Sequence, residues 1–107
     1  MTHVLLAIAI ISEVIGTISL KYAEGFTRLV PSLLVIAGYG AAFVLLSLVL
    51  ARGLPVGIVY GIWAACGVAL VAIIGVLFLG ETLTWIQGLG LALIVVGVLA
   101  IEMGGVP

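Results

Sequence analysis

Residues 4–20 read VLLAIAIISEVIGTISL, an apolar run interrupted by one charged residue, Glu13. A run of this length is near the lower limit for a membrane-spanning helix. A carboxylate at the bilayer centre costs about 2.5–3.5 kcal/mol on insertion scales, so an acid there indicates function. Lys21 lies about 12 Å further along a helix, and both arginines fall in predicted loops. We therefore expect Glu13 to be protonated or paired with a cation from outside the protein.

The composition excludes a soluble domain. Of 107 residues, 66% are hydrophobic and 7% are charged, whereas soluble domains carry about 25% charged residues. A net charge of −1 gives no basic surface for nucleic acid. The single cysteine, Cys66, excludes an intrachain disulfide and a cysteine-based metal cluster. No catalytic or nucleotide-binding motif occurs, so we expect neither an enzyme nor a metal or cofactor site.

Four apolar runs predict an all-α membrane protein with a single four-helix transmembrane domain over residues 1–107. Each run is long enough, or nearly so, to cross a hydrocarbon core about 30 Å thick. The first lacks the basic start of a signal peptide, so we retain it as a membrane helix. The predicted spans are 4–20, 32–51, 57–79 and 86–103.

Short connections join these spans, so sequential helices are expected to be antiparallel. The most polar connection runs from Lys21 to Pro31, and Pro55 ends the next one. In the third connection, Thr82 or Thr84 is placed to cap the last helix.

The basic residues favour one orientation by a single charge. Arg52 lies on one side of the membrane, and Lys21 and Arg28 lie on the other. Under the positive-inside rule this bias is weak, which leaves open both dual insertion and one narrowly preferred orientation. Many transporters combine two repeats of inverted topology. This chain shows no internal duplication, and an antiparallel pair of identical chains would supply the inverted half.

Small residues share the helical face of Glu13. Ala9, Gly16 and Thr17 lie on it, together with larger apolar side chains. These small residues are consistent with either a closely packed neighbouring helix or an open chamber beside the carboxyl. Of the two, we expect the chamber and assign Ala9, Gly16 and Thr17 to the substrate cavity. The larger members of this face are Leu6, Ile10 and Leu20.

Aromatic residues in the middle spans are candidates for binding a cation. Tyr60 and Trp63 fall on one helical face, and their rings attract organic cations by about 0.5–2 kcal/mol each. Tyr39 would add a third ring or a phenolic hydrogen bond to the carboxylate. The alternative for Tyr60 is an interfacial aromatic belt.

Glycines mark two further features. Gly90 and Gly97 lie on one stripe of the fourth span, where they permit close helix approach for dimerisation or for packing within the chain. Gly67 lies in the glycine-rich third span, and we expect a conformational hinge there.

Several of these motifs resemble one known family. EVIGT at 13–17, EGFTRL at 24–29 and PVGIVYGIW at 55–63 closely resemble small multidrug resistance transporters, as does the pair Gly90 and Gly97. The resemblance covers essentially the whole chain, and a buried acid followed by EGFTRL is a specific combination.

The resemblance implies a proton-coupled antiporter of the bacterial cell (inner) membrane that works as an antiparallel dual-topology homodimer. The acid matching Glu13 binds protons and substrate in turn, and glycines matching Gly90 and Gly97 carry much of the dimer contact. The resemblance also implies that the aromatic residues Tyr39, Tyr60 and Trp63 line the substrate cavity.

The multidrug branch of the family is the better match. Relatives that export guanidinium ions typically have tryptophan in place of Gly16, glycine in place of Ala9 and serine in place of Ala42. The expected substrates are therefore hydrophobic, aromatic or quaternary ammonium cations. This chain departs from the branch in having Ala64-Ala65 after Trp63, where Ser-Gly is usual.

Three alternatives remain open. A guanidinium-type exporter is the alternative within the family. A non-transporting assembly subunit, in which Glu13 makes an interhelical hydrogen bond, is the alternative from another class. The natural partner is either a second copy or a different chain.

Overall fold

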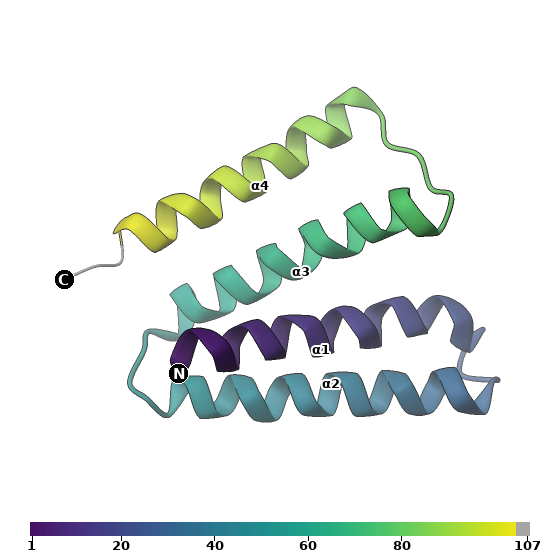
Figure 1. Cartoon of the computed structure of the whole chain (residues 1–107), viewed down its shortest axis with the longest axis horizontal. Helices are drawn as coiled ribbons and strands as arrows, with labels where there is room; N and C mark the ends of the chain where they lie inside the picture. The colour runs from purple at the N-terminus through teal and green to yellow at the C-terminus, as the bar shows by residue number, and fades with distance from the viewer. Residues whose placement is uncertain (105–107) are drawn as a thin grey trace. The chain divides into compact units, whose positions relative to one another are not determined.

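Four α-helices make up most of residues 1–104, the part of the chain that this computed structural model describes (Figure 1). Each is at least 20 residues long and contains an 18-residue stretch with a mean hydropathy of 2.0 to 2.5, enough to cross a membrane. This confirms the predicted all-α fold with four membrane-spanning helices. The helices are α1 (Thr2–Ala23), α2 (Leu29–Leu50), α3 (Val56–Phe78) and α4 (Trp85–Gly104).

The connection between α1 and α2 is shorter than predicted. We expected the second span to begin at residue 32, after Pro31, but α2 begins at Leu29 and therefore includes Pro31. The expectation was wrong because proline is tolerated in the first turn of a helix, where its missing N–H has no intrahelical acceptor. The Ser32 hydroxyl donates to the carbonyl of Arg28 and strengthens this first turn.

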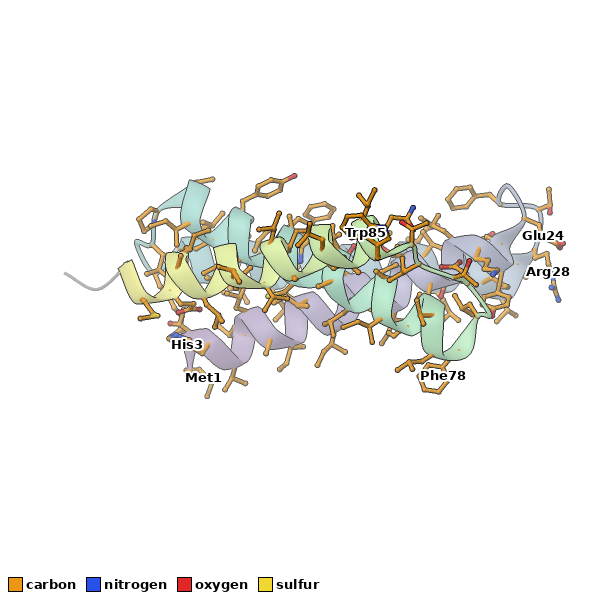
Figure 2. All side chains as sticks on the ribbon, turned by 90° about the horizontal axis from the view of Figure 1, so that it is seen from above. Met1, His3, Glu24, Arg28, Phe78 and Trp85 are labelled. Carbon is orange, nitrogen blue, oxygen red and sulfur yellow. The ribbon has the colours of Figure 1, made fainter. Side chains whose placement is uncertain are left out.

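Residues 24–28 reverse the chain through left-handed backbone. Glu24, Gly25 and Phe26 have φ angles of 48°, 72° and 65°, a conformation that is uncommon outside glycine. The Thr27 hydroxyl donates to the Glu24 carbonyl at 2.7 Å. Figure 2 shows Glu24 and Arg28 together at this end of the α1–α2 pair and Met1 and His3 at the other. The α1–α2 reversal is thus fixed mainly by backbone geometry.

Helix ends in the second half of the chain carry specific caps. The Gln87 backbone N–H donates to Thr84 Oγ1 at 3.2 Å, and the Thr84 N–H donates to Gln87 Oε1 at 3.0 Å. This reciprocal pair is a capping box, so Thr84 is the residue that caps α4. At the end of α3, Gly80 has φ 70° and the Glu81 N–H donates to the Gly75 carbonyl at 3.0 Å. By contrast, α1 and α2 begin without a side-chain capping hydrogen bond.

The contacts divide the chain into two units, Met1–Pro55 and the part that begins at Val56. The first unit is the antiparallel pair α1–α2, and the second is the antiparallel pair α3–α4. The single domain predicted for the whole chain stays a prediction. Most buried residues of the first pair are small or β-branched, among them Ala9, Val14, Gly16, Val35, Gly38, Ala42 and Val49.

Candidate functional site: Glu13 and the α1–α2 contact

The two helices of the first unit meet closely at a pair of glycines, Gly16 on α1 and Gly38 on α2. A Cβ atom on Gly38 would lie 2.8 Å from the Gly16 nitrogen and 2.7 Å from the Ser12 carbonyl oxygen. Distances this short to backbone atoms leave no room for any side chain at position 38. The contact therefore requires glycine and sets the separation of the helices, as small residues do in membrane-helix packing.

Tyr39 follows Gly38 and packs over the other glycine of the contact. A Cβ atom on Gly16 would lie 3.0 Å from Cδ2 of the Tyr39 ring. The Tyr39 ring also stacks on Phe43, with centroids 6.4 Å apart and an interplanar angle of 27°. The space that the absent side chain of Gly16 leaves is thus occupied by the ring of Tyr39.

A hydrogen-bond chain connects Glu13 to the second helix. Thr17 lies one helical turn after Glu13, and its hydroxyl donates to Glu13 Oε1 at 2.7 Å. The same hydroxyl is hydrogen-bonded to the phenolic oxygen of Tyr39. A phenolic hydrogen bond to the carboxylate was one of the two roles expected of Tyr39; in the structure Thr17 stands between the two groups.

The second carboxyl oxygen of Glu13 is the unusual atom of the site. Oε2 is buried and has no hydrogen-bond partner in residues 1–104. The exposed pair Arg28–Glu24, 3.8 Å apart, forms a salt bridge at the α1–α2 turn and does not involve Glu13. A buried acceptor with no partner costs free energy, and a proton or a cation at this oxygen would lower that cost.

The second unit holds the other two predicted aromatic residues. The Tyr60 and Trp63 rings have centroids 5.7 Å apart at an interplanar angle of 52°. Trp63 is 7% exposed and Tyr60 is 56% exposed. The rings form one aromatic pair on α3, as their spacing predicted.

The remaining predicted residues have varied environments. Ala9 is fully buried on α1. Gly67 is buried within α3, which is helical throughout its length. Gly90 and Gly97 lie on α4, and a Cβ atom on either would meet nothing within 4 Å. Leu20, which shares the Glu13 face by its spacing, is 39% exposed, whereas Ser19 and Ala23 are buried.

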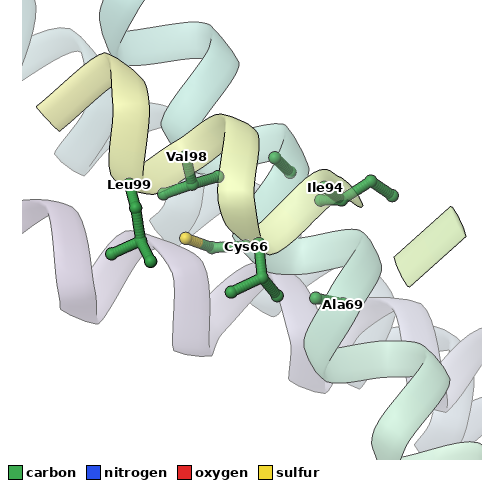
Figure 3. Close-up of a pocket in the computed structure, with 7 residues that line it drawn as sticks. Cys66, Ala69, Ile94, Val98 and Leu99 are labelled. Atoms are coloured by element: carbon green, nitrogen blue, oxygen red, sulfur yellow. The ribbon is translucent and has the colours of Figure 1, made fainter. Parts of the chain in front are cut away.

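A cavity of about 100 Å³ lies between α3 and α4. Figure 3 shows the Cys66 side chain of α3 facing Val98 and Leu99 of α4 in this cavity. The side chains that line it are apolar apart from the thiol, and they include none of the predicted cavity residues.

Gly38 was missed by sequence reasoning. Its position beside Tyr39 was the available signal, but the neighbouring Gly40 looks equivalent in sequence and has nothing within 4 Å of a Cβ atom. Only the rotation of α2 against α1 distinguishes the two glycines.

Residues 1–94 match the family model described as Small Multidrug Resistance protein. The chain belongs to the small multidrug resistance family. It is 49% identical over 100 residues to the quaternary ammonium compound-resistance protein QacF of Klebsiella aerogenes, covering 94% of this chain and 90% of that protein. The family assignment expected from the motifs is thereby confirmed.

The alignments with two further relatives cover most of both chains. The multidrug resistance protein Mmr of Mycobacterium tuberculosis (strain H37Rv) is 41% identical over 105 residues, 98% of each chain. The quaternary ammonium compound-resistance protein QacE of Escherichia coli is 47% identical over 98 residues, 92% of this chain and 88% of that protein. Together with the four helices, this family membership identifies a multi-pass cell membrane protein from a family of multidrug resistance transporters.

Proposed function

We propose that this chain exports hydrophobic aromatic or quaternary ammonium cations in exchange for protons, as an antiparallel dual-topology homodimer. Glu13 binds the proton and the cation in turn, because the carboxylate carries one negative charge and either ligand neutralises it. Binding of one therefore excludes binding of the other. Competition between them gives exchange.

The observation that carries this proposal is the buried Oε2 atom of Glu13. One carboxyl oxygen is held by Thr17, while the other has no hydrogen-bond partner in the described part of the chain. A carboxylate inside a membrane helix is expensive, and the cost falls when a ligand neutralises it. A group that only stabilised helix packing would have both oxygens satisfied.

The nature of the cation follows from desolvation and from the aromatic residues. A quaternary ammonium ion has no N–H groups to satisfy, so it enters an apolar site with little loss of hydration, and aromatic faces attract it. Tyr39, Tyr60 and Trp63 are the side chains we assign to this role. The relatives QacF and QacE are named for resistance to quaternary ammonium compounds, which supports the same substrate class.

The dimer is supported by the surface of α4. This helix has no buried residue in the portion described, and Gly90 and Gly97 are open to close approach by another helix. Two copies in opposite orientations would form the inverted repeats that alternating access uses. Gly67 of α3 is assigned as the hinge of that motion.

The proposal is tested by binding of tetraphenylphosphonium to the purified full-length chain in detergent. Binding should tighten as pH rises, because protons compete for the same carboxylate. Glu13→Gln should lose this binding and its pH dependence, whereas Glu24→Gln, which changes an exposed acid, should keep both. Wild-type affinity in Glu13→Gln would show that the carboxylate is not the binding group.

Transport separates the proposal from its alternatives. In proteoliposomes with an imposed pH gradient, the wild type should move tetraphenylphosphonium against its concentration gradient and Glu13→Gln should not. A scaffold protein would move no cation. Faster exchange of guanidinium than of tetraphenylphosphonium in the same vesicles would favour the guanidinium-exporting branch.

A further inference from the structure

The Thr17 hydroxyl joins a group on α1 to a group on α2. It donates to Glu13 Oε1 at 2.7 Å and is hydrogen-bonded to the phenolic oxygen of Tyr39. A hydroxyl has one proton, so it donates one hydrogen bond and accepts others. Because its proton is directed to Glu13, Thr17 must accept the hydrogen bond from Tyr39. While Glu13 is charged, donation therefore runs from Tyr39 to Thr17 to Glu13.

Protonation changes what this chain of groups can do. A proton on Oε2 would have no acceptor within residues 1–104. A proton on Oε1 has one, since the Thr17 oxygen lies within hydrogen-bonding distance. Glu13 then donates to Thr17, the Thr17 hydroxyl rotates and donates to Tyr39, and the Tyr39 hydroxyl hydrogen turns away from Thr17. One proton is added and no covalent bond breaks: both hydroxyls keep their own hydrogens, and the two hydrogen bonds exchange donor and acceptor.

We infer that protonation of Glu13 reverses the Tyr39–Thr17–Glu13 hydrogen-bond chain, so that Thr17 is a positioning residue that transmits the charge state of α1 to Tyr39 on α2. This inference rests on the proposed function, because it assumes that Glu13 alternates between charged and neutral forms. It assigns Thr17 a role distinct from contact with the substrate, and it makes Tyr39 the receiver of the signal.

The glycine contact keeps the three groups in register. Gly16 and Gly38 immediately precede Thr17 and Tyr39, and their backbones are too close for any Cβ atom at position 38. The helices are therefore held at one separation beside the hydrogen-bond chain. The hydrogen bonds can then reverse their donors and acceptors by rotation of the Thr17 and Tyr39 hydroxyl groups, without a change in the helix separation. Tyr39 is the one titratable side chain of α2, the helix packed against Glu13.

The pH profile of cation binding tests this role. A hydrogen bond donated to a carboxylate stabilises the charged form more than the neutral form. Thr17→Val, which removes the hydroxyl and keeps the shape, should raise the pH of half-maximal tetraphenylphosphonium binding by about one unit. At pH values below the wild-type midpoint, the apparent affinity of Thr17→Val for tetraphenylphosphonium should be about tenfold lower than that of the wild type. At pH values well above the Thr17→Val midpoint, the two affinities should be close.

Two variants control for structural damage. Thr17→Ser keeps the hydroxyl and should restore the wild-type midpoint. Ser19→Ala removes another buried α1 hydroxyl, which donates to the Ile15 carbonyl at 2.7 Å, and should leave the midpoint unchanged. A general destabilisation of α1 would weaken cation binding at every pH. A loss of affinity at low pH without a loss at high pH is therefore specific to the hydrogen bond.

Infrared spectra report on Tyr39 directly. With ring-labelled tyrosine, the band lost in Tyr39→Phe identifies this residue, and its C–O stretch should shift at the same pH as the Glu13 carboxyl band. Thr17→Val should abolish the shift and Thr17→Ser should retain it. A Tyr39 band that stays constant through the Glu13 titration overturns the inference, even if Thr17→Val does not fold.

Failure of the inference and failure of the proposed function give different results. If wild-type binding depends on pH and on Glu13 but the Thr17→Val midpoint is unchanged, Thr17 has no such role and the exchange mechanism stands. If wild-type binding is independent of pH, or survives Glu13→Gln, the proposed function itself is wrong.

Discussion

The α1–α2 pair and the α3–α4 pair bury their surfaces in different ways. In the first, two glycines bring the backbones together and a polar chain crosses between the helices. In the second, a cavity of about 100 Å³ separates part of the facing surfaces, and the described part of α4 has no buried residue. The first pair therefore buries part of both of its helices, whereas the described part of α4 in the second has no buried residue.

This difference follows from what drives helix association in lipid. Lipid tails are as apolar as leucine, so burial of apolar surface alone gives little stabilisation, and close packing and hydrogen bonds decide. The α1–α2 pair has both. On α4, large side chains such as Leu93 and Val96 are more than 60% exposed, which suits contact with lipid or with a second chain.

Gly38→Ala should have the largest effect, because it places a Cβ atom against the backbone of α1. Overpacking of this kind costs about 1–3 kcal/mol. We expect the free energy of unfolding in detergent to fall by that amount, measured by titration with a denaturing detergent. Gly40→Ala, two positions along α2 with nothing within 4 Å of its Cβ position, is the matched control. Equal stability of the two variants would show that the glycine contact does not hold the pair together.

Gly97→Val should act on assembly and leave the fold of the chain intact. Its Cβ position is open within the chain, so we expect the free energy of unfolding to be unchanged. The dimer dissociation constant, measured by energy transfer between labelled copies, should rise about tenfold, equivalent to about 1.4 kcal/mol. Gly88→Val lies on the opposite side of α4 from the Gly90–Gly97 stripe and should leave the constant unchanged. An unaffected dimer in Gly97→Val would place the interface elsewhere.

Ala65→Val should have the smallest effect, a gain in stability. Ala65 lines the cavity between α3 and α4, and filling a cavity commonly adds about 0.5–2 kcal/mol. We expect the lower part of that range, measured by thermal unfolding in detergent. Ala64→Val, which adds the same atoms outside the cavity lining, should give no gain. A loss of stability in Ala65→Val would mean that the helices cannot accommodate the larger side chain there.

The sequence was sufficient for features that depend on composition and local spacing. The four spans follow from apolar length. The cap of α4 was narrowed to Thr82 or Thr84 by the position of these threonines before the last apolar run, and the structure shows Thr84. The proposed role of Glu13 rests on the cost of a carboxylate in lipid. Because each of these is decided within a few residues of the chain, no tertiary information was needed to predict them.

Features that depend on helix rotation were not predictable in the same way. Gly38 and Gly40 are equivalent by composition, and only the facing surface of α1 makes one of them essential. The role of Thr17 between Glu13 and Tyr39 requires the helix separation that the glycines set. Pro31 was misplaced because proline marks either a loop or a first helical turn, and local sequence does not choose between them.

The unequal capping of the helices bears on how each one sits in the bilayer. At the start of α4, the side chains of Thr84 and Gln87 each accept a hydrogen bond from the backbone N–H of the other residue. Fewer amide groups are therefore unpaired at this end, which lowers the cost of placing it in hydrocarbon. The starts of α1 and α2 have no such side-chain bond, so their first N–H groups need acceptors from outside the helix. A shift along the bilayer normal should therefore cost less at the start of α4 than at the start of α1 or α2, and bilayers of different thickness should be accommodated first at α4.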